Sequence, residues 1–162
     1  MSTTLDDTIE VSMVVNGDPW QGALKPRLSL ADFLREVLNL TGTHLGCEHG
    51  VCGACTILVD DQPQRACLSL AVGMNGGRIT TVEGMSGERV DALRAAFAEH
   101  HALQCGFCTP GMLVTASDML SRGVCESEAR VRQELAGNIC RCTGYQGLVK
   151  AIRTVAQKEV KP

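Results

Sequence analysis

The sequence predicts an α+β protein with a small sheet in its first half and helices in its second half. Three observations lead to this fold class. Apolar and polar residues alternate from Ile9 to Val15, apolar residues recur at helical spacing after residue 88, and a glycine-rich stretch (73–87) separates the two patterns. We therefore expect one domain over residues 1–84 and a second over residues 85–162.

The first half is expected to hold strands around one helix. Asn16-Gly17 follows the first strand and is typical of a β-hairpin turn. Ser29 with Asp32 resembles a capping box, and the apolar residues of Leu30–Leu38 follow helical spacing, with Gly42 suited to the helix end. Further strands are predicted over Thr56–Val59, Gln64–Cys67 and Arg78–Val82, the first two joined by a turn at Asp60–Pro63.

The second half is expected to hold four helices, which together imply a short bundle. The first helix has one face formed by Val90, Leu93, Phe97 and His101, and the second begins with Thr109 as its cap and Pro110 as its first residue. The third has Ser127 as its cap and ends at Gly137. The fourth carries an apolar stripe of Leu148, Ile152, Val155 and Ala156.

Composition narrows the function. The chain has 162 residues and a net charge of −3, which offers no nucleic-acid surface and no basic membrane anchor. No apolar run approaches the roughly 20 residues of a membrane span, and the polar, acidic N-terminus lacks the features of a signal peptide. We therefore expect a cytoplasmic protein. Because thiols stay reduced there, nine cysteines indicate metal ligation rather than disulfides.

A first group of four cysteines has the spacing of plant-type [2Fe–2S] ferredoxins. Three of them lie in one loop as C-x4-C-x2-C and the fourth follows after eleven residues: Cys47, Cys52, Cys55 and Cys67. Gly46, Gly50 and Gly53 punctuate this loop; they permit tight turns and let bare amides point at an anionic cluster. Buried apolar cysteines would not be expected at this spacing.

A second group of four cysteines consists of two close pairs at predicted helix boundaries. Cys105 and Cys108 precede the helix at Thr109, while Cys140 and Cys142 lie between Gly137 and the last helix. Two such loops meeting in a bundle supply four thiolates, whose charge a helix N-terminus favours.

Two rival metal sites compete with this interpretation. An all-thiolate zinc site could use Cys52, Cys55, Cys105 and Cys108, but it leaves the other four cysteines of the two groups without a role. A Rieske centre needs two histidine ligands, and Cys47-Glu48-His49 has no second half to match it. Cys125 stands outside both groups, as an unliganded thiol near a loop. The four histidines are expected on the surface or in loops: His44, His49, His100 and His101.

Three segments carry a family resemblance. Gly46–Thr56 (GCEHGVCGACT), Leu103–Met112 (LQCGFCTPGM) and Gly137–Tyr145 (GNICRCTGY) resemble the small iron–sulfur subunit of the xanthine oxidase family of molybdenum hydroxylases. The similarity extends over nearly the whole chain and is complete at all eight cysteine positions.

The resemblance implies a plant-type ferredoxin-like β-grasp domain followed by a four-helix bundle, each holding one [2Fe–2S] cluster. It implies that the cluster of Cys105, Cys108, Cys140 and Cys142 lies nearest a molybdopterin, expected as the cytosine dinucleotide. The cluster of the first group then lies nearer an FAD. It further implies that Gln104 hydrogen-bonds the pterin and that Cys142 approaches it.

On the same resemblance, the partners are a large molybdopterin subunit and a medium FAD subunit, in a dimer of heterotrimers. This chain would then carry electrons with no catalytic residue of its own. The alternative is a free-standing two-cluster ferredoxin, for which the charge of −3 is mild.

Overall fold

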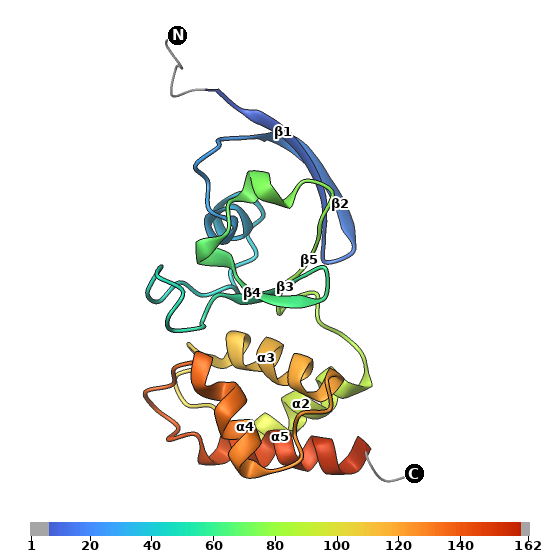
Figure 1. The fold of residues 1–162 in the computed structure, drawn as a ribbon, viewed down its shortest axis with the longest axis vertical. Helices are drawn as coiled ribbons and strands as arrows, with labels where there is room; N and C mark the ends of the chain where they lie inside the picture. Colours follow the sequence, from blue (N-terminus) through green and yellow to red (C-terminus); the bar gives the residue numbers. More distant parts are fainter. Residues whose placement is uncertain (1–6, 160–162) are drawn as a thin grey trace.

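The computed structural model describes residues 7–159, which form a sheet-containing lobe and a helical lobe (Figure 1). The first lobe is a five-stranded sheet of order β2-β1-β5-β3-β4, in which only the β1–β5 pair is parallel. Its strands are β1 (Ile9–Val15), β2 (Asp18–Leu24), β3 (Thr56–Val59), β4 (Gln62–Arg65) and β5 (Arg78–Thr80).

A short helix covers the concave side of this sheet. It begins as α1 (Leu30–Asp32) and continues as the π-helical segment η1 (Phe33–Val37). The predicted cap is confirmed, because the Ser29 Oγ accepts the Asp32 N–H at 3.0 Å and donates to its carboxylate at 2.7 Å. Phe33 and Leu34 are fully buried in a core shared with the alternate residues of β1. Short 3₁₀ segments, η2 (Ala66–Leu68) and η3 (Ala71–Met74), complete the lobe.

The structure corrects three predictions in the first lobe. The π-helical turn widens the helix, so Val37 is 47% exposed although the α-helical spacing placed it on the apolar face. The helix ends before Asn39, whose φ of +55° supplies the left-handed residue expected at Gly42. The second hairpin turns on Asp60-Asp61 alone, both with positive φ, so β4 starts two residues earlier than predicted and Cys67 lies in η2.

The helical lobe contains the four predicted helices. They are α2 (Glu88–Glu99), α3 (Thr109–Ser121), α4 (Glu128–Glu134), which continues as the 3₁₀ segment η4 (Leu135–Gly137), and α5 (Gln146–Glu159). They enclose a separate core in which Phe97, Met112, Met119 and Ile152 are fully buried. No helix within residues 7–159 has the length and apolarity that crossing a bilayer requires.

Two details of the helical lobe differ from the prediction. His101 lies beyond the end of α2 with a φ of +52° and is exposed, so it does not continue the apolar face. Cys108, rather than Thr109, occupies the cap position of α3, and the buried Thr109 hydroxyl makes no hydrogen bond. The Ser127 cap is confirmed, since its Oγ accepts the Arg130 N–H at 3.1 Å.

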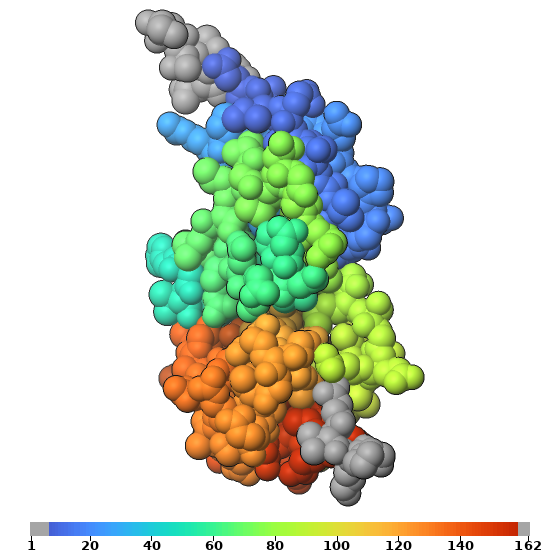
Figure 2. Space-filling model, turned by 45° about the vertical axis from the view of Figure 1, so that its right-hand side comes forward, coloured from blue at the N-terminus to red at the C-terminus, as the bar shows by residue number. Residues whose placement is uncertain are grey.

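The two lobes meet along α3, which packs against β3 and β4. On the face shown in Figure 2, the cyan and green first lobe meets the orange part of the helical lobe without a break. A small apolar cluster lies at this boundary, where Leu58 of β3 packs against Met85, Val90 and Val114 taken together. The loops that carry the two cysteine groups lie on either side of the same boundary, which brings distant parts of the sequence together.

Candidate metal centres

The loop before β3 is shaped around a sulfur atom. The Cys47 Sγ accepts the backbone N–H groups of Cys52 and His49, both at 3.4 Å. Glu48 and Gly50 have φ values of +54° and +75°, which turn these amides inward. The hydrogen bonds from Cys52 and His49 lower the pKa of the Cys47 thiol to about 6. The loop therefore stabilises negative charge on sulfur, as an anionic metal ligand requires.

The remaining cysteines of this group lie deeper. Cys55 is 2% exposed, and its burial is the main cause that raises the pKa of its thiol to about 11; the Cys67 backbone N–H lowers this pKa and the Cys67 thiol raises it. The N–H of Ala66 donates to the Cys55 carbonyl at 3.1 Å and ties η2 to the end of the cysteine loop. The group thus forms two pairs, Cys47 with Cys52 and Cys55 with Cys67.

The second group also forms two pairs. The Sγ atoms of Cys105 and Cys142 are 3.5 Å apart, and both residues are exposed. Cys140 is buried and Cys108 is half-buried, and their side chains hydrogen-bond to each other. Burial raises the pKa of the Cys108 thiol to about 12, whereas the Phe107 N–H and the Cys142 thiol lower the pKa of Cys105.

Thr143 and Tyr145 hold the loop around Cys140. Burial raises the pKa of the Cys140 thiol, but the Thr143 hydroxyl (3.2 Å) and N–H (3.5 Å) donate to its sulfur, and the net shift of its pKa is downward. The Tyr145 hydroxyl accepts the Cys140 N–H at 2.8 Å and donates to the Asn138 carbonyl at 2.9 Å. Neither residue was assigned a role from the sequence, although both lie within three residues of Cys142.

The donor set fits two binuclear clusters. Each group consists of two cysteine pairs, and a [2Fe–2S] cluster has two irons, each of which would take one such pair of sulfur ligands. Within residues 7–159, no three or more His, Cys, Asp or Glu side chains are arranged to hold a single metal ion. Metal binding must remove protons from Cys55 and Cys108, whose raised pKa values keep them protonated in the free chain.

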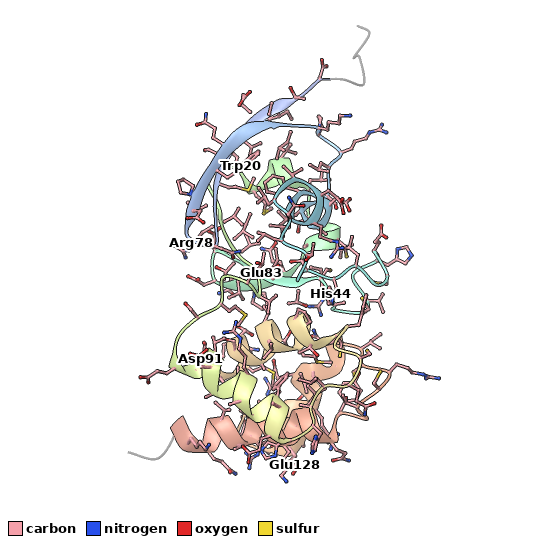
Figure 3. The ribbon with its side chains drawn as sticks, turned by 180° about the vertical axis from the view of Figure 1, so that it is seen from behind. Trp20, His44, Arg78, Glu83, Asp91 and Glu128 are labelled. Carbon is pink, nitrogen blue, oxygen red and sulfur yellow. The ribbon has the colours of Figure 1, made fainter. Side chains whose placement is uncertain are left out.

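The other sequence-predicted residues lie as follows. Gln104 is exposed beside the exposed Cys105–Cys142 pair. Cys125 lies in the loop between α3 and α4, as the sequence predicts, and it is 5% exposed because it packs in the helical core; its carbonyl accepts the Arg153 guanidinium at 2.9 Å. His44 lies at the lower edge of the first lobe (Figure 3), where its Nδ1 donates to the Phe107 carbonyl at 2.7 Å and its ring stacks on Phe107.

Direct hydrogen bonds join the two cysteine loops. The Ile139 N–H donates to the Cys52 carbonyl at 2.8 Å, and the Asn138 Nδ2 donates to the Gly53 carbonyl at 3.1 Å. Arg65 of β4 adds a bond from its Nη2 to the Gly137 carbonyl at 2.5 Å. The backbone between Cys52 and Cys55 is therefore fixed against the backbone that leads into Cys140.

Comparisons with known proteins agree with this arrangement. The family described as "2Fe-2S iron-sulfur cluster binding domain" matches residues 14–72, and that described as "[2Fe-2S] binding domain" matches residues 81–153. Caffeine dehydrogenase subunit gamma of Pseudomonas sp. (strain CBB1) is 49% identical over 150 residues, with 90% of each chain covered. The nicotine 6-hydroxylase small subunit of Paenarthrobacter nicotinovorans is 49% identical over 146 residues, covering 90% of this chain and 88% of that one.

A solved structure is equally similar. In the crystal structure of quinoline 2-oxidoreductase from Pseudomonas putida 86, a chain superposes with a TM-score of 0.86 at 51% identity, covering 93% of this chain and 94% of that one. The xanthine dehydrogenase iron-sulfur-binding subunit of Escherichia coli O157:H7 is 40% identical over 149 residues, covering 90% of this chain and 93% of that one. The chain belongs to the [2Fe–2S] iron–sulfur subunits of the xanthine oxidase family of molybdenum hydroxylases, as a non-catalytic subunit of an oxidoreductase complex.

Proposed function

We propose that this chain conducts electrons from a molybdopterin on a large partner subunit, through two [2Fe–2S] clusters, to an FAD on a medium partner subunit. The observation that carries the proposal is the contact between two complete cysteine groups, through the Ile139 N–H and the Cys52 carbonyl. A [2Fe–2S] cluster supplies one-electron chemistry, and two of them close together suit transfer over a distance.

The ligand assignment follows the observed pairs. Cys47 with Cys52 and Cys55 with Cys67 would each hold one iron of the first cluster. In the second cluster, one iron would be held by Cys105 with Cys142 and the other by Cys108 with Cys140. The sheet order β2-β1-β5-β3-β4 supports a plant-type ferredoxin-like β-grasp domain up to residue 84, and α2 to α5 support a four-helix bundle from residue 85.

The exposed side of the second group is the proposed contact with the molybdopterin. Gln104 and Cys142 both lie there, and a carboxamide offers the donor and acceptor that a pterin edge requires. The partners are the large molybdopterin (cytosine dinucleotide) and medium FAD subunits, which we expect as a dimer of heterotrimers in the cytoplasm. Relatives named for caffeine, nicotine and quinoline suggest nitrogen heterocycles as the first substrates to try.

The test is metal analysis of the chain, produced with and without candidate partner subunits. We expect about four irons and four acid-labile sulfides per chain, with a visible spectrum that bleaches on reduction. About two irons per chain with every cysteine intact would refute the presence of two clusters. A colourless protein that contains zinc would refute the presence of either cluster. A loaded chain that never copurifies with larger subunits would instead support the free-standing ferredoxin.

A further inference from the structure

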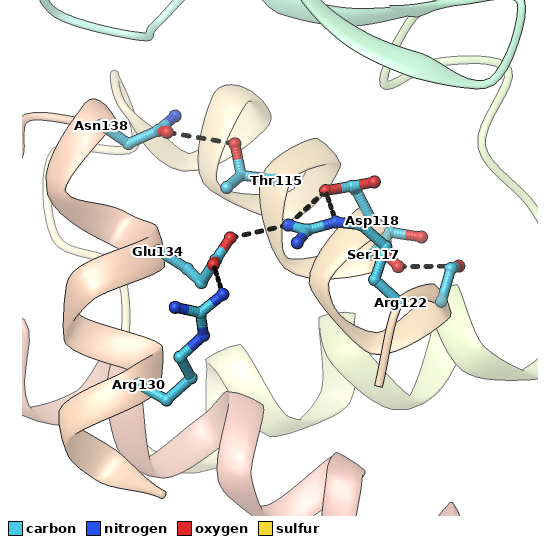
Figure 4. A network of polar contacts seen from close by, with 8 residues as sticks. Thr115, Ser117, Asp118, Arg122, Arg130, Glu134 and Asn138 are labelled. Atoms are coloured by element: carbon cyan, nitrogen blue, oxygen red, sulfur yellow. Dashed lines mark hydrogen bonds and ion pairs between the residues drawn. The ribbon is translucent and has the colours of Figure 1, made fainter. Parts of the chain in front are cut away.

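A buried asparagine lies between the two cysteine loops. Asn138 is 2% exposed and precedes Cys140 by two residues. Its Nδ2 donates to the Gly53 carbonyl in the first lobe at 3.1 Å, and its Oδ1 accepts the Thr115 hydroxyl of α3 at 3.1 Å (Figure 4). One side chain therefore links α3, the Cys140 loop and the Cys52–Cys55 loop.

The acceptor on the first lobe is itself held in place. The Gly53 carbonyl also accepts the Thr56 N–H at 3.2 Å and the Thr56 hydroxyl at 2.6 Å. Arg65 donates both to the Thr56 hydroxyl and to the Gly137 carbonyl across the boundary. We call this set of contacting residues the interlobe seam: Gly53, Thr56, Arg65, Thr115, Gly137 and Asn138.

The hydrogen bonds of the seam fix the position of one lobe relative to the other, which apolar packing alone cannot do. The nearby packing of Leu58 against the cluster that contains Val114 is apolar and non-directional, so it tolerates sliding of one lobe on the other. Hydrogen bonds with fixed donors and acceptors do not, and a buried polar group that loses its partner is unfavourable. Gly53 admits no side chain here, because a Cβ would lie 2.8 Å from the Asn138 Nδ2 and 2.9 Å from its Cα.

We propose that Asn138 is a positioning residue for electron transfer between the two clusters. It sets the separation and orientation of the two ligand loops through its bond to Gly53, and its side-chain hydrogen bonds go to Gly53, Thr56 and Thr115. This inference rests on the proposed function. Because electron tunnelling weakens exponentially with distance, a small separation of the lobes slows transfer even when both clusters are complete.

The test uses the assembled complex with Asn138→Leu, which keeps the size of the side chain and removes its hydrogen bonds to Gly53, Thr56 and Thr115. All eight cysteines remain, so iron and sulfide content should match the parent. The amide of Ile139 should exchange with solvent roughly five- to thirty-fold faster, as expected for one lost buried hydrogen bond. The magnetic splitting between the two reduced clusters in EPR spectra should narrow, and electrons should reach the first cluster more slowly.

Val131→Ala is the matched control. Val131 is fully buried in the helical core on α4 but lies outside the seam. The substitution should therefore lower the stability of the helical lobe without changing the magnetic splitting between the clusters. Arg65→Met provides a second seam variant from the other lobe, because it removes the bond to the Gly137 carbonyl. It should narrow the splitting in the same direction as Asn138→Leu.

The outcomes separate the two proposals. A parent chain that holds no iron–sulfur cluster refutes the proposed function. Full clusters with an unchanged splitting in both seam variants overturn the role of Asn138, even if exchange at Ile139 rises. Loss of clusters in both seam variants shows that these side chains serve assembly rather than placement, and this also overturns it.

Discussion

Gly111→Ala should destabilise the protein, although the same change stabilises an ordinary helix. Gly111 lies in the first turn of α3 and faces the first lobe. A Cβ there would overlap the Gly53 carbonyl oxygen and lie 3.1 Å from that of Ala54. The lobes must therefore move apart. Because the bond from Asn138 to Gly53 is 3.1 Å long, a movement of about 0.5 Å takes it beyond hydrogen-bonding range.

The expected magnitude is a balance of three effects. Alanine gains about 1 kcal/mol over glycine in a helix. Overpacking costs about 1–3 kcal/mol, and the lost hydrogen bond costs about 1 kcal/mol more. The net loss is about 1–3 kcal/mol, which lowers the thermal unfolding midpoint by about 2–12 °C.

The assay is thermal unfolding of the cluster-loaded protein, followed by circular dichroism and by loss of the visible spectrum. Gly73→Ala is the control, because nothing lies within 4 Å of the added Cβ and the residue has no positive φ. It should leave the midpoint unchanged or raise it. A Gly111→Ala protein as stable as the parent, with Ile139 still protected from exchange, would show that the lobes do not approach as closely as described.

Three further predictions concern single side chains. Cys125→Ser should keep both clusters but lower the free energy of unfolding by about 1–3 kcal/mol, because it buries a hydroxyl in the helical core; loss of iron would show that Cys125 is a ligand. Gln104→Ala should leave both clusters assembled yet slow their reduction by substrate in stopped-flow measurements. If the variant has its full cofactor content and its clusters are reduced as fast as those of the parent, Gln104 has only a structural role. In the cluster-free chain at pH 7–8, Cys47 should react with iodoacetamide well before Cys55 and Cys108, since only a pKa of about 6 gives mostly thiolate there; mass spectrometry of the labelled peptides that finds equal rates would contradict this order.

Local patterns allowed much of the fold to be predicted. The alternation over Ile9–Val15, the turn at Asn16-Gly17 and the Ser29 cap depend on neighbouring residues, and the structure contains all three. The prediction for the last turn of the helix after Ser29 was wrong, because a π-helical turn shifts every later side chain around the helix axis. The apolar spacing in the sequence does not reveal such a turn. Asn39, not a glycine, supplies the positive φ at its end.

The seam could not be predicted from local patterns. Asn138 and Gly53 are 85 positions apart, and Arg65 and Gly137 are 72 apart, so no spacing in the sequence relates them. The role of Tyr145 was easier to predict from the sequence, because this residue lies three residues after Cys142 and its hydroxyl hydrogen-bonds the backbone of the same loop. The cysteine spacing indicates which residues gather, but only the packed lobes show how the two groups face each other.

The burial of the second cysteine group gives the proposed electron path a direction. The Cys105–Cys142 pair is exposed beside Gln104, whereas Cys140 is buried and follows Ile139, which binds the Cys52 carbonyl. A cluster held by these four residues would have one side open to a partner subunit and the other against the first lobe. On the proposed function, electrons that enter at the open side would have a covalent and hydrogen-bonded route onward through the Cys140 loop and the bond from Ile139 to Cys52. The seam is where that route crosses between lobes, so changes there should affect transfer between the clusters before they affect reduction of the second cluster by the partner.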